Sequence, residues 1–297
     1  MLELLMLGAA FCWAAGFAVV RGVIVRVPAV QVAAVRLMGA GSVFIAVALV
    51  TGRGPQILAI PTQNLIAIVV SVILGAGVGD AIVLAAIRHI GVARAYAIAY
   101  SYPFVAVLIA VGWLGETLSG PAIAGVFLVV VGGVLASIEP AARGVVAVRA
   151  SRRRAALSTG VVLSVTAALI WGVSTNATKI AVTGIDPVVA NAVRMPLAAV
   201  VIGAAATALT RRPPFARLGR RDLAIALFSG FLGLALGSAL YVYALPHVGA
   251  ARGAALSAPS PVFALVLSIV FLRERPGWKA ILGVPVTAVG VALLTVR

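Results

Sequence analysis

Three ionisable side chains lie inside long apolar stretches of the sequence. Asp80 is the only acidic residue well inside such a stretch, and Arg36 and Arg194 each lie near the start of one. In lipid, a buried charge costs at least about 2.5 kcal/mol on insertion scales, so an ionisable residue there is a candidate for function by default. We therefore take these three residues as candidates for substrate binding or charge coupling.

Arg36 lies about seven residues after the start of its apolar stretch, and Asp80 about seven residues before the end of the next one. Both are therefore expected at similar depth from the same membrane face, so an ion pair between them is possible. In one interpretation Asp80 is a carboxylate that couples transport to protons or cations. In the other it is the internal counterion of Arg36, which is the commoner way to accommodate a buried charge. The sequence leaves both interpretations standing.

Aromatic and polar residues lie close to prolines in two further stretches. Tyr96 and Tyr100 are four residues apart, so they share one helix face, and Pro103 follows them; in the second stretch Ser257 precedes Pro261. Proline frees backbone carbonyls, and discontinuous membrane helices at matching positions mark binding sites. The two tyrosines either stack on a substrate ring or belong to the interfacial aromatic belt.

Three other polar residues complete the candidate substrate-binding set. Asn176, in a cluster of Ser and Thr, either lines a cavity or donates a hydrogen bond to a neighbouring helix. Tyr241 follows Ser238 by three residues and shares its helix face. We expect no cofactor and no metal site, because the single Cys12 and the two separated histidines have no companions that would complete one.

The composition places these residues in a lipid bilayer. Of the 297 residues, 63% are hydrophobic and only 10% are charged, too apolar for a water-soluble core. The apolar runs are continuous and approach the roughly 20 residues that a spanning helix needs, so we predict an all-α integral membrane protein. Ten spans are expected, at 4–20, 29–50, 65–87, 94–112, 121–138, 158–178, 188–209, 223–245, 252–272 and 279–296. The net charge of +16 comes largely from arginines at span ends, which favours contact with lipid headgroups over nucleic acid.

The chain aligns with itself at an offset of 158 residues, which indicates a duplication. The offset pairs Trp13 with Trp171, Arg36 with Arg194, His89 with His247, Pro103 with Pro261, Glu116 with Glu274, and glycines 75, 79, 125 and 132 with glycines 233, 237, 283 and 290. Each copy holds five spans, and an odd number inserts the second copy in the opposite orientation. We therefore predict two inverted five-helix repeats, residues 1–139 and 158–297, joined by a basic linker at 140–157. Such repeats are a recurrent construction of transporters, and the paired glycines read as close-packing seams between helices.

The two copies differ at one informative position. Ser238 stands where the first copy has Asp80, so Arg194 has no equivalent acid. This leaves Arg194 available for a carboxylate-bearing substrate, which a guanidinium binds bidentately. The alternative is that Arg194 hydrogen-bonds helix-end carbonyls.

The order of these features is the same in both copies: a Trp in the first helix, an Arg early in the second, a Pro in the fourth, a Glu just past it and a Gly-rich fifth helix. With ten helices in two copies, this order resembles the EamA-type drug/metabolite transporter superfamily. The resemblance covers nearly the whole chain. It implies a secondary exporter or exchanger of amino acids, metabolites or toxic compounds across the cytoplasmic membrane. The related small multidrug-resistance proteins carry an essential Glu in the first helix, whereas residues 14–17 here are uncharged. If transport is coupled to protons, Asp80 is the candidate.

Rival classes have less support. An enzyme would need a convergent catalytic set, which the sequence lacks. A channel or a non-transporting membrane scaffold remains the alternative, although a scaffold would not require broken helices at matched positions. We expect a monomer or homodimer. The orientation is open, because the arginine-rich loops favour both termini outside and the family resemblance favours them inside.

Overall fold

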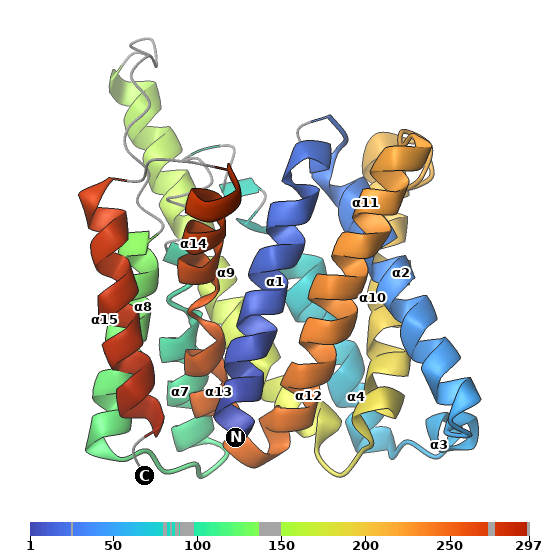
Figure 1. The fold of residues 1–297 in the computed structure, drawn as a ribbon, viewed down its shortest axis with the longest axis horizontal. Helices are drawn as coiled ribbons and strands as arrows, with labels where there is room; N and C mark the ends of the chain where they lie inside the picture. Colours follow the sequence, from blue (N-terminus) through green and yellow to red (C-terminus); the bar gives the residue numbers. More distant parts are fainter. Residues whose placement is uncertain are drawn as a thin grey trace. The chain divides into compact units, whose positions relative to one another are not determined.

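The computed structural model describes residues 1–24, 26–79, 82, 83, 85, 86, 89, 98–136, 150–272 and 277–295, and the regular structure in this part of the chain is helical (Figure 1). The all-α prediction is confirmed for these residues. The α-helices are α1 (Leu2–Ile24), α2 (Ala29–Val50), α3 (Gly54–Leu58), α4 (Thr62–Val72), α7 (Tyr102–Gly112), α8 (Gly120–Ala136), α9 (Ala150–Val182), α10 (Pro187–Thr210), α11 (Arg220–Gly230), α12 (Gly237–Val248), α13 (Ala250–Ser257), α14 (Ser260–Leu272) and α15 (Trp278–Thr295). Two π-helical segments, η1 (Ile73–Gly79) and η2 (Phe231–Leu236), continue α4 and α11.

Seven helical stretches of the described chain are long and apolar enough to cross a membrane. They are Leu2–Val20, Val30–Val50, Leu157–Val182, Pro187–Thr210, Arg220–Val248, Ala250–Leu267 and Trp278–Thr295. Three shorter apolar helices, Thr62–Gly75, Tyr102–Gly112 and Gly120–Leu135, fall in the predicted third, fourth and fifth spans. The chain is thus a multi-span helical membrane protein. The predicted linker lies at 140–157: residues 140–149 fall outside the described part, and 150–157 form the first turns of α9.

The helices pack into two compact units, and each unit draws on both halves of the sequence. The first unit comprises Met1–Gly77 and Ala177–Gly249, and the second comprises Val78–Asn176 and Ala250–Arg297. These units are defined by packing, whereas the predicted repeats are defined by sequence register. The boundaries of the repeats therefore stay a prediction.

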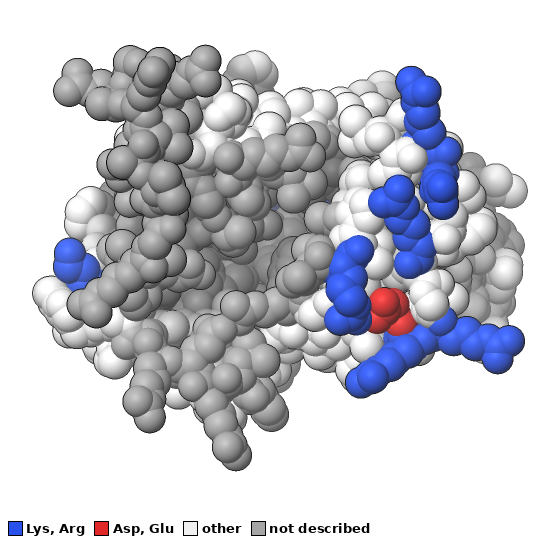
Figure 2. Space-filling model, turned by 90° about the horizontal axis from the view of Figure 1, so that it is seen from above, with Lys and Arg blue, Asp and Glu red and all other residues white. Residues whose placement is uncertain are grey.

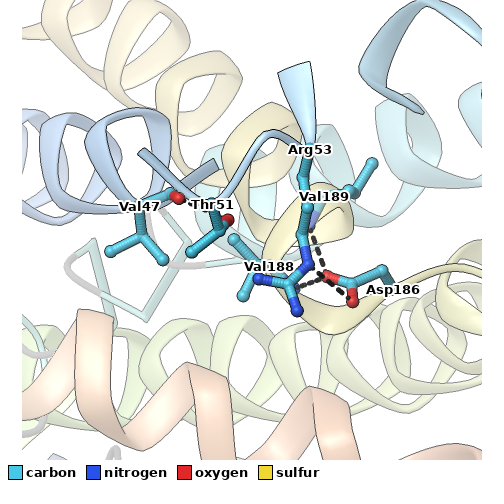
Figure 3. Close-up of polar contacts among 6 residues, drawn as sticks. All are labelled: Val47, Thr51, Arg53, Asp186, Val188 and Val189. Atoms are coloured by element: carbon cyan, nitrogen blue, oxygen red, sulfur yellow. Dashed lines mark hydrogen bonds and ion pairs between the residues drawn. The ribbon is translucent and has the colours of Figure 1, made fainter. Parts of the chain in front are cut away.

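In the first unit, one carboxylate fixes the start of α10. Asp186 occupies the N-cap position, and its Oδ1 accepts hydrogen bonds from the backbone N–H groups of Val188 (2.8 Å) and Val189 (3.2 Å). Pro187 suits the first helical turn because the N–H that it lacks would have no helical partner. The Nε of Arg53, in the loop after α2, lies 3.1 Å from Oδ2 of Asp186 (Figure 3). The beginning of α10 is thereby tied to the end of α2.

The opposite ends of these two helices are also joined, so α2 and α10 run antiparallel. Gln31, near the start of α2, donates from Nε2 to the hydroxyl of Thr210 at the end of α10, over 3.0 Å. Between the two ends, Gly41 lies so close to α10 that a Cβ there would be 3.1 Å from the backbone nitrogen of Pro196. Phe44, Met195, Ile202 and several alanines form the apolar core around this contact.

In the second unit, α8 and α15 also pack antiparallel, side by side in Figure 1. A Cβ at Gly125 would lie 2.7 Å from the carbonyl oxygen of Gly290, and one at Gly132 would lie 2.6 Å from the backbone nitrogen of Thr287. Small residues allow membrane helices this close approach. The pair joins the fifth predicted span of one copy to the fifth of the other.

The two π-helical segments occupy matching positions, since η2 begins 158 residues after η1. A π-helix has i→i+5 hydrogen bonds and is rare, so its occurrence at the same register in both halves of the sequence is consistent with the predicted duplication. Glycines line η2 in the first unit. A Cβ at Gly16 of α1 would lie 3.0 Å from the Cα of Gly233, and one at Gly237 would lie 2.9 Å from the Trp13 ring. The predicted close-packing role of these two glycines in η2 and α12 is confirmed.

Candidate functional site

In the first unit, the buried side-chain amide of Asn191 hydrogen-bonds two of the predicted site residues, Arg194 and Ser238. Asn191 of α10 is fully buried, and its Oδ1 accepts from the hydroxyl of Ser238 (3.0 Å) and from Nη1 of Arg194 (3.3 Å). Its Nδ2 donates to the carbonyl oxygen of Ser238 over 3.4 Å. Nη2 of Arg194 donates to the hydroxyl of Thr178, on α9, over 3.4 Å. Three helices, α9, α10 and α12, thus position one guanidinium.

Among the described residues, the hydrogen bonds of Arg194 go to neutral acceptors. None of the ion pairs between described residues includes it, and its Nε is buried there without a hydrogen-bond partner. A guanidinium has five N–H donors, and two long hydrogen bonds satisfy only part of that capacity. Both hydrogen bonds of Arg194 within the described part of the chain go to side chains rather than to helix-end carbonyls. A partly exposed cation with spare donors inside an apolar helix suits a planar anionic group such as a carboxylate.

An aromatic pair joins α1 to α12, the helix that carries Ser238. The Tyr241 ring packs against Trp13 of α1, with the ring centroids 5.3 Å apart and the planes tilted by 54°. Gly237 provides the room, because any Cβ there would collide with the indole. Tyr241 follows Ser238 by three residues, so the predicted shared face is consistent with its place one turn along α12.

Arg36, the equivalent of Arg194 in the first copy, is placed differently. It is 5% exposed and belongs to the contact between α2 and the glycines around η2. Its Nη2 would lie 3.1 Å from a Cβ at Gly233, and its backbone lies against Gly230. The charged group therefore lies where two glycines bring helices close together. Asp80, the predicted partner of Arg36, and Tyr96 both lie outside the described residues.

In the second unit, the two proline-associated helices are broken at equivalent positions. Residues 100 and 101 form a turn before α7, and residues 258 and 259 form a turn between α13 and α14, 158 residues later. The predicted matching breaks are confirmed. Tyr102 and Ser257 flank the two breaks, and their hydroxyl oxygens are 2.7 Å apart in a buried hydrogen bond. The breaks in the two copies thus meet each other.

Aromatic rings surround this meeting point. Tyr100 and Tyr102 both contact Trp171 of α9, each with ring centroids 6.1 Å apart, and lie 6.3 Å from one another. Of the two predicted tyrosines, Tyr100 therefore belongs to a packed aromatic cluster. The cluster contains Trp171 and the other aromatic pair contains Trp13, the two tryptophans that the predicted duplication aligns.

Asn176 forms an interhelical contact in the second unit. It is 4% exposed and donates from Nδ2 to the carbonyl oxygens of Gly172 (2.9 Å) and Ala106 (3.1 Å), the latter on α7. Its Oδ1 is buried without a partner among the described residues. Of the two interpretations from the sequence, the hydrogen bond to a neighbouring helix is present, and the free carbonyl oxygen leaves a role in binding as a prediction.

Several participants carried no clear signal in the sequence. Asn191 connects Arg194 to Ser238, and the spacing of three residues before Arg194 was the clue available. Trp13 and Trp171 served only as markers of the duplication. Tyr102 directly precedes Pro103, but its partner Ser257 lies 155 residues away in the sequence.

Comparison with known proteins identifies a family for both halves of the chain. Residues 1–138 and 158–296 match the model of the EamA-like transporter family, one match for each predicted copy. A curated protein of Streptantibioticus cattleyicolor, named a probable terminal-alkyne amino-acid exporter, is 31% identical over 140 residues. That stretch covers 47% of this chain and 46% of the exporter, so the similarity spans about half the length of that relative. A solved crystal structure, described only as a protein, covers 99% of this chain with 95% of its own, at 21% identity and a TM-score of 0.78; it shares the fold.

Proposed function

Because this chain belongs to the EamA-like transporter family, we propose that it is a secondary exporter or exchanger of small organic metabolites that carry a carboxylate, with amino acids among them. It works across the cytoplasmic membrane by alternating access, as a monomer or homodimer. The name of the Streptantibioticus relative, an amino-acid exporter, favours this substrate class. The binding residues that we propose are those predicted above, with Arg194 as the anchor of the carboxylate.

The proposed architecture is ten spans in two inverted five-helix copies. The seven long apolar helices and three shorter ones among the described residues support this proposal. Inversion is supported by the antiparallel packing of α2 with α10 and of α8 with α15, because each of these pairs joins equivalent spans of the two copies. Inverted copies can exchange conformations, which is how such transporters expose one site to each side in turn.

The proposal depends mainly on the surroundings of Arg194. An arginine inside a membrane helix is costly, and this one is oriented by Asn191 and Thr178 without a carboxylate among the described residues. A substrate carboxylate would supply the missing charge. Charge-assisted hydrogen bonds of this kind contribute about 1.5–3 kcal/mol, which corresponds to about 10- to 100-fold in affinity.

Counterflow in proteoliposomes tests this directly. Vesicles preloaded with an unlabelled amino acid are diluted into the labelled compound, and parallel vesicles receive the corresponding amino-acid amide, which lacks the carboxylate, or a lipophilic cation. We expect saturable exchange of the acid and little exchange of the amide. Arg194→Gln raises the half-saturation concentration about 10- to 100-fold, and Arg194→Lys recovers part of the loss because an ammonium retains the charge without the bidentate geometry.

Arg212→Gln is the matched control, since it removes the same charge from an exposed position just beyond α10. It should leave exchange unchanged. Unaltered half-saturation in Arg194→Gln for every carboxylate tested would refute the anchor. Exchange that does not saturate in the wild type would refute the carrier itself and favour a channel.

A further inference from the structure

A small cavity lies in the first unit where the end of α1 meets the start of α11. It has a volume of about 230 Å³ and is lined by Val19, Gly22, Val23, Arg26, Arg221 and Ile225. A Cβ at Gly22 would have no atom within 4 Å, so the cavity is open at that point. None of these residues takes part in the polar cluster around Arg194.

The lining is polar at one end and apolar at the other. On α11, Ile225 lies one turn, about 5.4 Å, beyond Arg221. On α1, which approaches the same face with its C-terminal end, Val19 and Val23 lie on the turns before Arg26. Arg26 therefore lies just beyond the C-terminal end of α1 and Arg221 in the first turn of α11, while the aliphatic residues lie further inside the two helices. This is the polarity of a phospholipid, with the phosphate at the surface and the acyl chains below.

The charge around the cavity is strongly positive. Nη2 of Arg26 lies 2.6 Å from Oδ1 of Asp222, and this ion pair holds the guanidinium at the cavity. The carboxylate of Asp222 is thereby paired with Arg26. Arg221 has no ion pair with a described residue. The neighbouring exposed arginines 211, 212, 217 and 220 add to the same surface, and Figure 2 shows basic side chains gathered there beside an acidic group.

We propose that this cavity is a binding site for one anionic phospholipid, whose phosphodiester contacts Arg221 and Arg26 while its glycerol and upper acyl carbons lie against Val19 and Ile225. The aliphatic wall favours a lipid over a free phosphate, which would gain nothing from it. The excess of arginines over acids favours an anionic headgroup over a zwitterionic one, because basic residues at a membrane surface attract anionic lipid by about 1 kcal/mol each. The site is independent of the transported substrate.

Native mass spectrometry of the detergent-purified protein, titrated with phosphatidylglycerol, tests the proposal. We expect one phosphatidylglycerol retained per chain and weaker retention of phosphatidylcholine of the same acyl length. Arg221→Gln lowers the apparent affinity about tenfold or more. Gly22→Phe fills the open part of the cavity without changing the charge and lowers it similarly.

The matched control is Arg217→Gln, which removes an arginine from the same surface but not from the cavity. It should shift the affinity less than about twofold. Equal losses in Arg221→Gln and Arg217→Gln would overturn the site in favour of a diffuse basic surface. Equal retention of phosphatidylcholine, or displacement of the lipid by soluble glycerol phosphate at comparable concentration, would overturn the choice of an anionic lipid. Circular dichroism of each variant establishes that it is folded.

Discussion

The α8–α15 contact permits a quantitative test by two neighbouring glycines. Gly132 and Gly133 lie in the same helix, so replacing either with Ala brings the same gain in helix propensity, about 0.5–1 kcal/mol. Their surroundings differ. A Cβ at Gly132 would collide with the Thr287 hydroxyl and would lie 2.6 Å from its backbone nitrogen and 2.8 Å from the carbonyl oxygen of Gly283. At Gly133 the nearest atom is the carbonyl oxygen of Ala258, at an ordinary 3.5 Å.

The difference between the two variants isolates the packing cost. Backbone atoms cannot rotate aside, so Gly132→Ala must push α8 away from α15, and overpacking of this kind costs about 1–3 kcal/mol. We expect Gly132→Ala to be less stable than Gly133→Ala by this amount, with Gly133→Ala equal to or slightly more stable than wild type. Equilibrium unfolding in mixed micelles of mild detergent and sodium dodecyl sulfate, followed by tryptophan fluorescence, measures the difference. Identical unfolding curves for the two variants would show that α8 and α15 are not in close contact.

Three further predictions concern the polar contacts. Tyr102→Phe and Ser257→Ala should be non-additive in unfolding free energy, with a coupling of about 1 kcal/mol, because either change removes the hydrogen bond between the broken helices; additive effects would contradict that contact. Asn191→Asp places a carboxylate beside Arg194 and should abolish exchange of carboxylate substrates while the protein stays folded; retained exchange would show that the guanidinium is not the anchor. Asp186→Ala should cost about 1 kcal/mol of stability through loss of the N-cap of α10, whereas Asp186→Asn keeps the cap and costs little; a large loss in both would point to the ion pair instead.

The features of the fold that could be predicted from the sequence, its helical class and the broken helices, are periodic or repeated. Continuous apolar runs predict membrane helices, and prolines at one register predict the breaks before Tyr102 and after Ser257, which the structure contains. The glycines at 233 and 237 could be assigned to close packing because their spacing returns to one helix face.

The remaining features depend on contacts between distant parts of the chain. No residue type marks a π turn, so η1 and η2 could not be anticipated. The bond between Asn191 and Ser238 requires two helices to face each other at one depth, which the 47 residues between them do not specify. From the sequence, Asn176 could either line a cavity or hydrogen-bond a neighbouring helix. The structure shows that its amide nitrogen donates to the carbonyl oxygens of Ala106 and Gly172.

The interleaving of the units bears on how the chain is made. When synthesis has reached residue 139, α2 still lacks α10 and α8 still lacks α15, so neither unit has its full complement of helices. Until the second half is inserted, the glycine-containing faces of α2 and α8 are therefore exposed to lipid. For the same reason, the two halves produced as separate polypeptides in one cell should find each other and restore a working protein, whereas either half alone should be degraded.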